Sequence, residues 1–162
     1  MKKTLVSLSI ATALFAGTQA QAANIVEVAQ EAGTFNTLIA AAKAAGLAGA
    51  LAEGKNLTVF APTDEAFAAL PEGTVETLLK PENKDKLVAI LSYHVLPRKL
   101  KSNQLSNGAI PVKTIKKGGD RTLSVAKSSK GVTVDNAKVV AADIKAENGV
   151  IHVIDSVLLP SS

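Results

Sequence analysis

Few side chains in this sequence have the types and spacing that catalysis or metal binding requires. The two histidines, His94 and His152, are isolated from any set of cysteines, histidines and carboxylates typical of a metal site. There is no cysteine, no glycine-rich phosphate loop and no G-x-S-x-G nucleophile motif. Spacing alone leaves open a hydrolase assembled from Ser92, His94 and a distant aspartate, because such groups meet in space. We nevertheless predict that the protein is not an enzyme, and we expect no cofactor and no metal site.

His94 belongs to the short string Leu91–Pro97, which ends an expected helix. Leu87, Leu91 and His94 fall on one helical face, so the imidazole lies at the inner edge of an apolar stripe. The interpretation that we favour is a packed, hydrogen-bonded histidine that joins helix to sheet, helped by the helix dipole when it is charged. His152 lies between two apolar residues of an expected strand, and the same structural interpretation applies to it.

A strand-to-helix elbow is predicted within residues 56–70. The β-branched and aromatic run from Leu57 to Phe60 indicates a buried strand. Pro62 is expected to stop strand pairing, because it has no N–H to donate. Thr63 is the expected N-cap of the following helix, and Phe67 is expected to anchor that helix in the core.

Two apolar runs, 139–144 and 150–159, predict a hairpin near the C-terminus. Asn148-Gly149 between them is a tight-turn signal, since both residues tolerate positive φ. The second run is apolar on both faces, which is typical of a central strand covered on both sides. Asp155 within it is expected to be hydrogen-bonded or to lie at the sheet margin.

In order and spacing, the segments 56–70, 91–97 and 148–160 resemble the two motif boxes and the central Tyr-His of the fasciclin domain. The resemblance runs over roughly residues 24 to 160. It implies a fasciclin-like fold and an extracellular adhesion or interaction module rather than an enzyme. In animal relatives the Tyr-His region is implicated in cell adhesion, which nominates Tyr93 and His94 as binding residues beside the structural interpretation.

Residues 1–22 have the features of a secretory signal peptide. Lys2 and Lys3 form a basic start, an apolar stretch follows, and Ala20-Gln21-Ala22 is a small-residue cleavage site. We expect cleavage before Ala23, so that residues 23–162 form a single secreted or periplasmic domain. The alternative is an uncleaved anchor, but the apolar stretch is short for a membrane span. No other apolar stretch approaches membrane length.

The order of the expected elements predicts one α+β domain. Helices are expected at 25–32, 35–45, 47–52, 74–79 and 81–93. Short strands follow from Val95 onward, with turns at 107–108, 117–120 and 128–131. We therefore expect a helical N-terminal half packed on a mixed or antiparallel β-sheet wedge.

Basic residues are concentrated in one part of the chain. Residues 23–97 have a net charge of −4, whereas residues 98–138 have ten Lys or Arg against two acids, a net of +8. Most of these cations are expected on edge strands and turns: Arg98, Lys99, Lys101, Lys113, Lys116, Lys117, Arg121, Lys127 and Lys130. They either protect edge strands from aggregation or attract an acidic polysaccharide, lipopolysaccharide or anionic lipid. Nucleic acid is not expected, because the chain is exported and the segment lacks aromatic residues for stacking.

These observations favour a secreted or periplasmic, monomeric, non-enzymatic module that binds a cell-surface protein or a polyanionic glycan or lipid surface. The alternative function is a periplasmic carrier of an apolar or lipid-like small molecule, because the aliphatic core could hold a pocket. A core without a sizeable internal cavity would count against the carrier.

Overall fold

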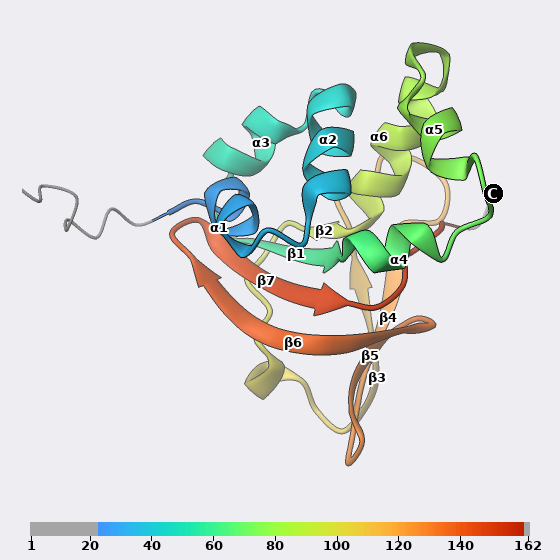
Figure 1. The fold of residues 1–162 in the computed structure, drawn as a ribbon. Coiled ribbons are helices and arrows are strands. Elements are labelled where there is room, and N and C mark those ends of the chain that lie inside the picture. The colour runs from blue at the N-terminus through green and yellow to red at the C-terminus, as the bar shows by residue number, and fades with distance from the viewer. Residues whose placement is uncertain (1–22, 161–162) are drawn as a thin grey trace, which may run out of the picture.

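The computed structural model describes residues 23–160, and Figure 1 shows helices gathered on one side of a curved sheet. The helices are α1 (Ile25–Ala32), α2 (Asn36–Ala45), α3 (Ala48–Glu53), α4 (Asp64–Ala68), α5 (Thr74–Leu79) and α6 (Lys84–Tyr93), with 3-10 turns η2 (Pro81–Asn83) and η3 (Ser102–Gln104). The strands are β1 (Leu57–Pro62), β2 (Val95–Leu96), β3 (Gly108–Lys113), β4 (Thr122–Ser128), β5 (Gly131–Val134), β6 (Ala137–Ala146) and β7 (Gly149–Ile154). The predicted α+β class and helical N-terminal half are confirmed. The predicted signal peptide lies outside the described residues.

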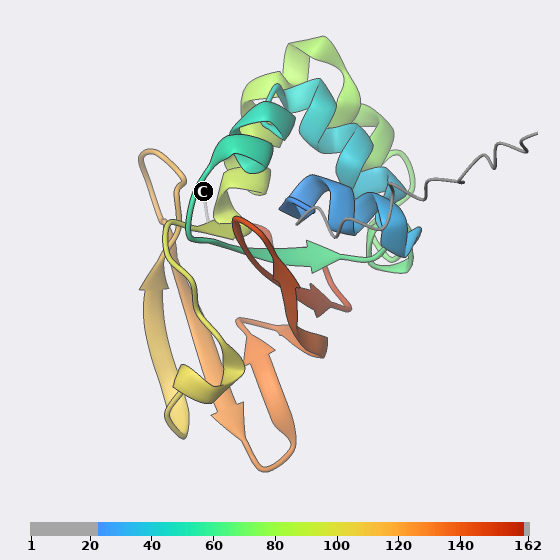
Figure 2. The same ribbon diagram turned by 90° about the vertical axis from the view of Figure 1, so that its left-hand side faces the viewer.

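The sheet is mixed, with the strand order β2-β1-β7-β6-β5-β4-β3. β1 and β7 are parallel, and the other neighbours are antiparallel. Ile115 N, just after β3, donates to Val95 O of β2 at 2.9 Å, so the two ends of the strand order approach each other. In Figure 2 the orange C-terminal strands accordingly curl away beneath the helices. All six residues of β7 are buried, which confirms a central strand, although it ends at Ile154 and not at 159 as predicted.

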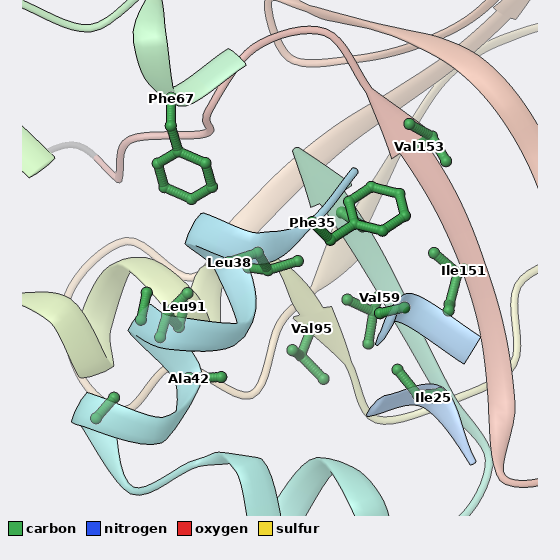
Figure 3. Close-up of a cluster of buried hydrophobic side chains, with 14 of the residues drawn as sticks. Ile25, Phe35, Leu38, Ala42, Val59, Phe67, Leu91, Val95, Ile151 and Val153 are labelled. Carbon is green, nitrogen blue, oxygen red and sulfur yellow. The ribbon is translucent and has the colours of Figure 1, made fainter. Parts of the chain in front are cut away.

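Two apolar clusters lie on opposite faces of the sheet centre. The first core lies between the helices and the sheet and includes Ile25, Phe35, Leu38, Ala42, Val59, Phe67, Leu91, Val95, Ile151 and Val153 (Figure 3). The second core lies within the curled sheet and includes Phe60, Tyr93, Leu96, Leu100, Leu105, Val112, Leu123, Val125, Val134, Ile154 and Leu158. Because side chains alternate along a strand, β7 contributes to both.

The predicted elbow is present, with one correction. Thr63 accepts from Ala66 N at 3.2 Å as the N-cap of α4, and Phe67 is buried in the first core. Pro62, however, is the last residue of β1 and lies opposite Ile154, so the strand extends through the proline. This is possible because a proline lacks only the donor and keeps its carbonyl. Asp64 also caps α2, since Thr37 N donates to its carboxylate at 2.7 Å.

The hairpin of β6 and β7 is confirmed, but the reason given for its turn is wrong. Neither Asn148 nor Gly149 has positive φ. A Cβ at Gly149 would instead clash with the carbonyl oxygen of Leu57, so glycine is needed where β1 approaches β7. The predicted turn at 107–108 is also wrong, because Gly108 begins β3 and no strand precedes it there.

Candidate functional site

His94 links helix α6 to strand β1 and to the C-terminal segment through hydrogen bonds. It ends α6 and is 1% exposed. Leu158 N donates to His94 Nε2 at 2.9 Å, so the ring must be protonated at Nδ1, which donates to Ile90 O at 2.8 Å. The His94 carbonyl accepts from Phe60 N of β1 at 2.8 Å. The predicted joining of helix to sheet is therefore confirmed.

His94 carries no charge near pH 7 with which the helix dipole could interact. Burial in the apolar interior lowers the pKa of the imidazole from 6.5 to about 4, so the ring is neutral near pH 7. Both ring nitrogens are bonded to backbone groups, which leaves no free lone pair to activate Ser92 as a nucleophile. The hydrolase that spacing had left open thus has no base at this position.

Tyr93 is also interior, although it was nominated as a binding residue. The ring is 3% exposed and lies in the second core. Its hydroxyl is placed to donate to Thr122 O at 3.0 Å and to Asp135 Oδ2 at 3.1 Å. Burial, and then the negative charge of Asp135, raise the pKa of the Tyr93 hydroxyl. Neither Tyr93 nor His94 presents a contact surface, because both side chains are enclosed and bonded within the fold.

A crossing segment, residues 97–105, runs from β2 across the sheet. Thr58 of β1 donates to Arg98 O at 2.6 Å and accepts from Leu100 N at 2.7 Å. Ser102 donates to Asp143 of β6 through both its backbone N–H and its hydroxyl. Lys127 of β4 reaches Ser102 O at 3.3 Å. The segment is thereby fixed to β1, β6 and β4, and it covers the second core.

His152 fixes the same crossing segment to β7, as the structural interpretation predicted. Its Nδ1 accepts from Asp143 N at 3.2 Å, so Nε2 carries the proton and donates to Leu100 O at 2.6 Å. The ring stacks on Phe60 with 5.6 Å between the ring centroids. Burial lowers the pKa of His152, and the ring is therefore neutral near pH 7. Asp143 reaches this position because it has a φ of 58° within an irregularity of β6.

Lys116, predicted to be a surface cation, is instead part of a loop's interior. It is 9% exposed, and its Nζ donates to Asp120 O at 2.8 Å and to Gly118 O at 3.4 Å. Its ammonium thus satisfies carbonyl groups of the β3–β4 loop. The sequence gives no sign of this burial, because lysine is ordinarily an exposed residue type.

The remaining cations do not form one continuous surface. Arg98, Lys99, Lys113, Lys117, Arg121 and Lys130 are exposed, whereas Lys101 and Lys127 are half-buried. Lys113 lies at one end of the β3–β4 pair, and Lys127 lies at the other end opposite Gly108. Five residues of extended strand span about 17 Å, which exceeds a Debye length of about 8–10 Å. We therefore define the basic loop as Lys113, Lys117 and Arg121, which gather at a single end.

An apolar cavity of about 120 Å³ lies in the first core, between α1, α2, α3 and the sheet. Its walls include Ile25, Ala29, Leu38, Ala42, Val59 and Ile151. Ala42, Val59, Val95 and Ile25, which are labelled in Figure 3 among the side chains of the first core, all line this cavity. A core without a cavity, which would count against the carrier function, is thus not what the structure has. The sequence pointed to a pocket only through its aliphatic core, and helical spacing could not locate the space.

The described residues carry few other features that point to chemistry. Within residues 23–160, no three histidines or carboxylates come together as a metal-ligand group would. Over the same range, no helix has both the length and the apolar character that crossing a bilayer requires. The candidate sites are thus the basic loop and the apolar cavity.

Comparison with known proteins assigns the family. Residues 33–160 match the family model of the Fasciclin domain. Protein sll1483 of Synechocystis sp. is 53% identical over 139 residues, which cover 86% of this chain and 74% of that protein. Transforming growth factor-beta-induced protein ig-h3 of Sus scrofa is 40% identical over 136 residues, or 84% of this chain and 19% of that one.

A solved structure agrees with this assignment at the level of the fold. The FAS1 domain pair from the insect cell adhesion molecule Fasciclin I aligns with a TM-score of 0.56 and 23% identity. The alignment covers 79% of this chain and 46% of that chain. The family-model match over residues 33–160 and the 53% identity to Protein sll1483 carry the assignment, because the solved structure supports the fold alone. This chain therefore belongs to the fasciclin domain family.

Proposed function

We propose that the protein is a secreted, non-enzymatic module that binds an anionic component of a cell surface or cell envelope. Family membership supports an interaction role, since the structurally similar domain pair comes from a cell adhesion molecule. A fold alone does not name a partner, so the partner's chemistry has to come from this chain's own surface. Acidic polysaccharide or an anionic lipid headgroup suits that surface, and a cell-surface protein with an acidic patch is the remaining candidate.

The basic loop carries this proposal. Lys113, Lys117 and Arg121 are exposed around one loop. The loop backbone is held by Lys116 and by Thr114, whose N–H donates to Arg121 O at 2.8 Å. Three cations on a loop whose backbone is fixed attract an anion without a further cost of ordering that backbone, although Asp120 in the same loop offsets one charge. Edge protection competes with this role, because β3 is an edge strand.

Retention on immobilised dextran sulfate tests the proposal. We expect wild type to be retained at low salt and released as salt rises to about 0.5 M, since screening shortens the reach of exposed charges. Reversal of the basic loop by Lys113→Glu, Lys117→Glu and Arg121→Glu should abolish retention. The control reverses three exposed lysines of the helical half, Lys43, Lys80 and Lys86, and changes the net charge equally.

The control separates a site from net charge. If both triple variants lose retention equally, overall charge explains the binding and the basic loop does not. If wild type is not retained at all, the cations serve edge protection, and replacing them by uncharged threonine should then increase aggregation. Circular dichroism of each variant checks that the fold is intact.

A further inference from the structure

The apolar cavity has the properties of a binding site for a small molecule. We propose that it binds an uncharged apolar molecule, such as a hydrocarbon ring or a short segment of a hydrocarbon chain. The site lies on the helical side of the sheet, in the first core rather than at the basic loop. The proposal is therefore independent of the proposed binding to an anionic surface.

Small side chains on the helices create the space. α1, α2 and α3 contribute Ala29, Ala42 and Ala48 to the wall, whereas the sheet contributes larger residues such as Val59 and Ile151. Alanine side chains end at Cβ, so they do not span the gap between a helix and a sheet. Protein interiors ordinarily hold few voids larger than a water molecule, which makes a cavity of about 120 Å³ unusual. A ligand that fills it would stabilise the folded state.

The wall selects against polar and charged ligands. His94 is the polar side chain at the cavity, and both of its nitrogens are bonded to backbone groups. In the part of the chain that the structure describes, every buried side-chain nitrogen and oxygen atom has a partner. A buried water needs two to four polar partners, and this wall offers none to spare. Dry apolar cavities of about 150 Å³ are known to take up benzene or xenon.

α3 is the part of the wall best suited to open. None of its residues is fully buried, and Gly49 within it weakens the helix. Ala50 is exposed and Leu51 half-buried, so the cavity wall reaches the surface there. The C-terminal end of α3 is held by Asn148, whose Nδ2 donates to Leu51 O at 2.6 Å. Short elements with few buried contacts open locally without global unfolding, which gives a ligand access.

Benzene and xenon are the probes that test this site, with Ala42→Leu as the filling variant. Ala42 faces the cavity, and leucine adds three carbon atoms at that place. The matched control is Ala44→Leu, at an exposed position of the same helix. We expect benzene to raise the Tm of wild type and of Ala44→Leu but not of Ala42→Leu. Xenon should shift the methyl NMR signals of cavity residues in wild type and leave Ala42→Leu unchanged.

The outcomes decide the proposal either way. If wild type binds neither probe, or if folded Ala42→Leu binds both as wild type does, the cavity is not the site. Should Ala42→Leu fail to fold, Ala29→Leu fills the same space from α1 and must abolish binding. Benzoate tests the ligand class, because its charge cannot be met by this wall. Binding of benzoate as strong as that of benzene would overturn the assignment of an uncharged ligand.

Discussion

His94 holds three parts of the molecule together through one side chain and one carbonyl. The imidazole bonds α6 to the C-terminal segment, and the carbonyl bonds α6 to β1. Because both nitrogens have backbone partners, removing the ring leaves the N–H of Leu158 and the carbonyl of Ile90 without them. Unpaired buried backbone groups cost free energy, so His94 contributes to the stability of the fold. The adhesion role carried over for Tyr93 and His94 would have to act through the fold.

The variant His94→Ala separates stability from binding. We expect the free energy of unfolding to fall by about 1–3 kcal/mol, because two buried hydrogen bonds are lost. The denaturation midpoint should drop, while retention on dextran sulfate should persist in the fraction that remains folded. An unchanged midpoint with lost retention would contradict this assignment and make His94 a contact residue.

Acidification should destabilise the protein through its two histidines. His94 stays neutral in the fold down to about pH 4, whereas the unfolded chain binds a proton below 6.5. The contribution of neutral His94 to stability is therefore complete above pH 6.5 and is lost as the pH falls from 6.5 to about 4. The loss amounts to about 3 kcal/mol, because each pKa unit corresponds to about 1.4 kcal/mol. Burial also lowers the pKa of His152, which adds a contribution of the same sign.

Urea midpoints measured from pH 7.5 to 4.5 check this pH dependence. Burial acts to raise the pKa of Asp64 and Asp143, but hydrogen bonds from Thr37 and Ser102 hold both below 3.8. These carboxylates therefore lose their contribution only at lower pH than the histidines do. A midpoint that stays level from pH 7 to 4.5 would mean that His94 titrates normally in the fold.

For single side chains, the sequence predicts burial better than it predicts hydrogen-bond partners. The helical spacing of Leu87, Leu91 and His94 places the ring inside, and the structure agrees. The partner Leu158 lies 64 positions away, and no local pattern indicates it. The prediction that Lys116 is a surface cation is wrong for a related reason, since its acceptors are carbonyls whose direction depends on the loop conformation.

Among the elements, the elbow of β1 and α4 connects the sheet to the helices. Phe67 reaches from α4 into the first core, and Thr63 caps the helix that carries it. Figure 3 shows the Phe67 ring reaching from α4 toward α2. The Phe67 ring and the Thr63 hydroxyl therefore help to orient α4, together with the bonds between Asp64 and the start of α2.

Two substitutions measure these contributions to the elbow. Phe67→Ala should lower the free energy of unfolding by roughly 3–5 kcal/mol, because it removes a buried aromatic ring. Thr63→Ala should cost about 1 kcal/mol as a lost helix cap. Chemical denaturation of both variants gives the two values. A neutral Phe67→Ala would mean that the ring is not packed as the structure has it.

Element boundaries followed from the sequence where local chemistry sets them. α1 and α5 begin and end at the residues that helix periodicity predicts. The turn before β7 was explained wrongly, because Gly149 is required by the approach of β1, a segment some ninety residues earlier. The role of Asn148 likewise depends on segments that are distant in the sequence. Its side chain accepts from Ile25 N and donates to carbonyls at the end of α3, which a turn pattern cannot indicate.

On the scale of the whole molecule, the sheet separates two cores that share β7. Ile151 and Val153 belong to the first core, whereas Ile154 belongs to the second. α6 joins them as well, since Leu91 points into the first core and Tyr93 into the second. The sequence predicts one domain but not this division, because alternation along β7 identifies two covered faces without saying what covers each.

Shared elements should make the two cores unfold together. Tyr93 is the single tyrosine of a chain without tryptophan, so its fluorescence reports on the second core. Far-UV circular dichroism reports mainly on the helices, which pack on the first core. We expect the two signals to give the same urea midpoint, as coincident probes do in a two-state transition. The variant Leu123→Ala, in the second core, should lower both midpoints equally. Helical signal that is lost while Tyr93 stays buried would show instead that helices packed on the first core open before the second core unfolds.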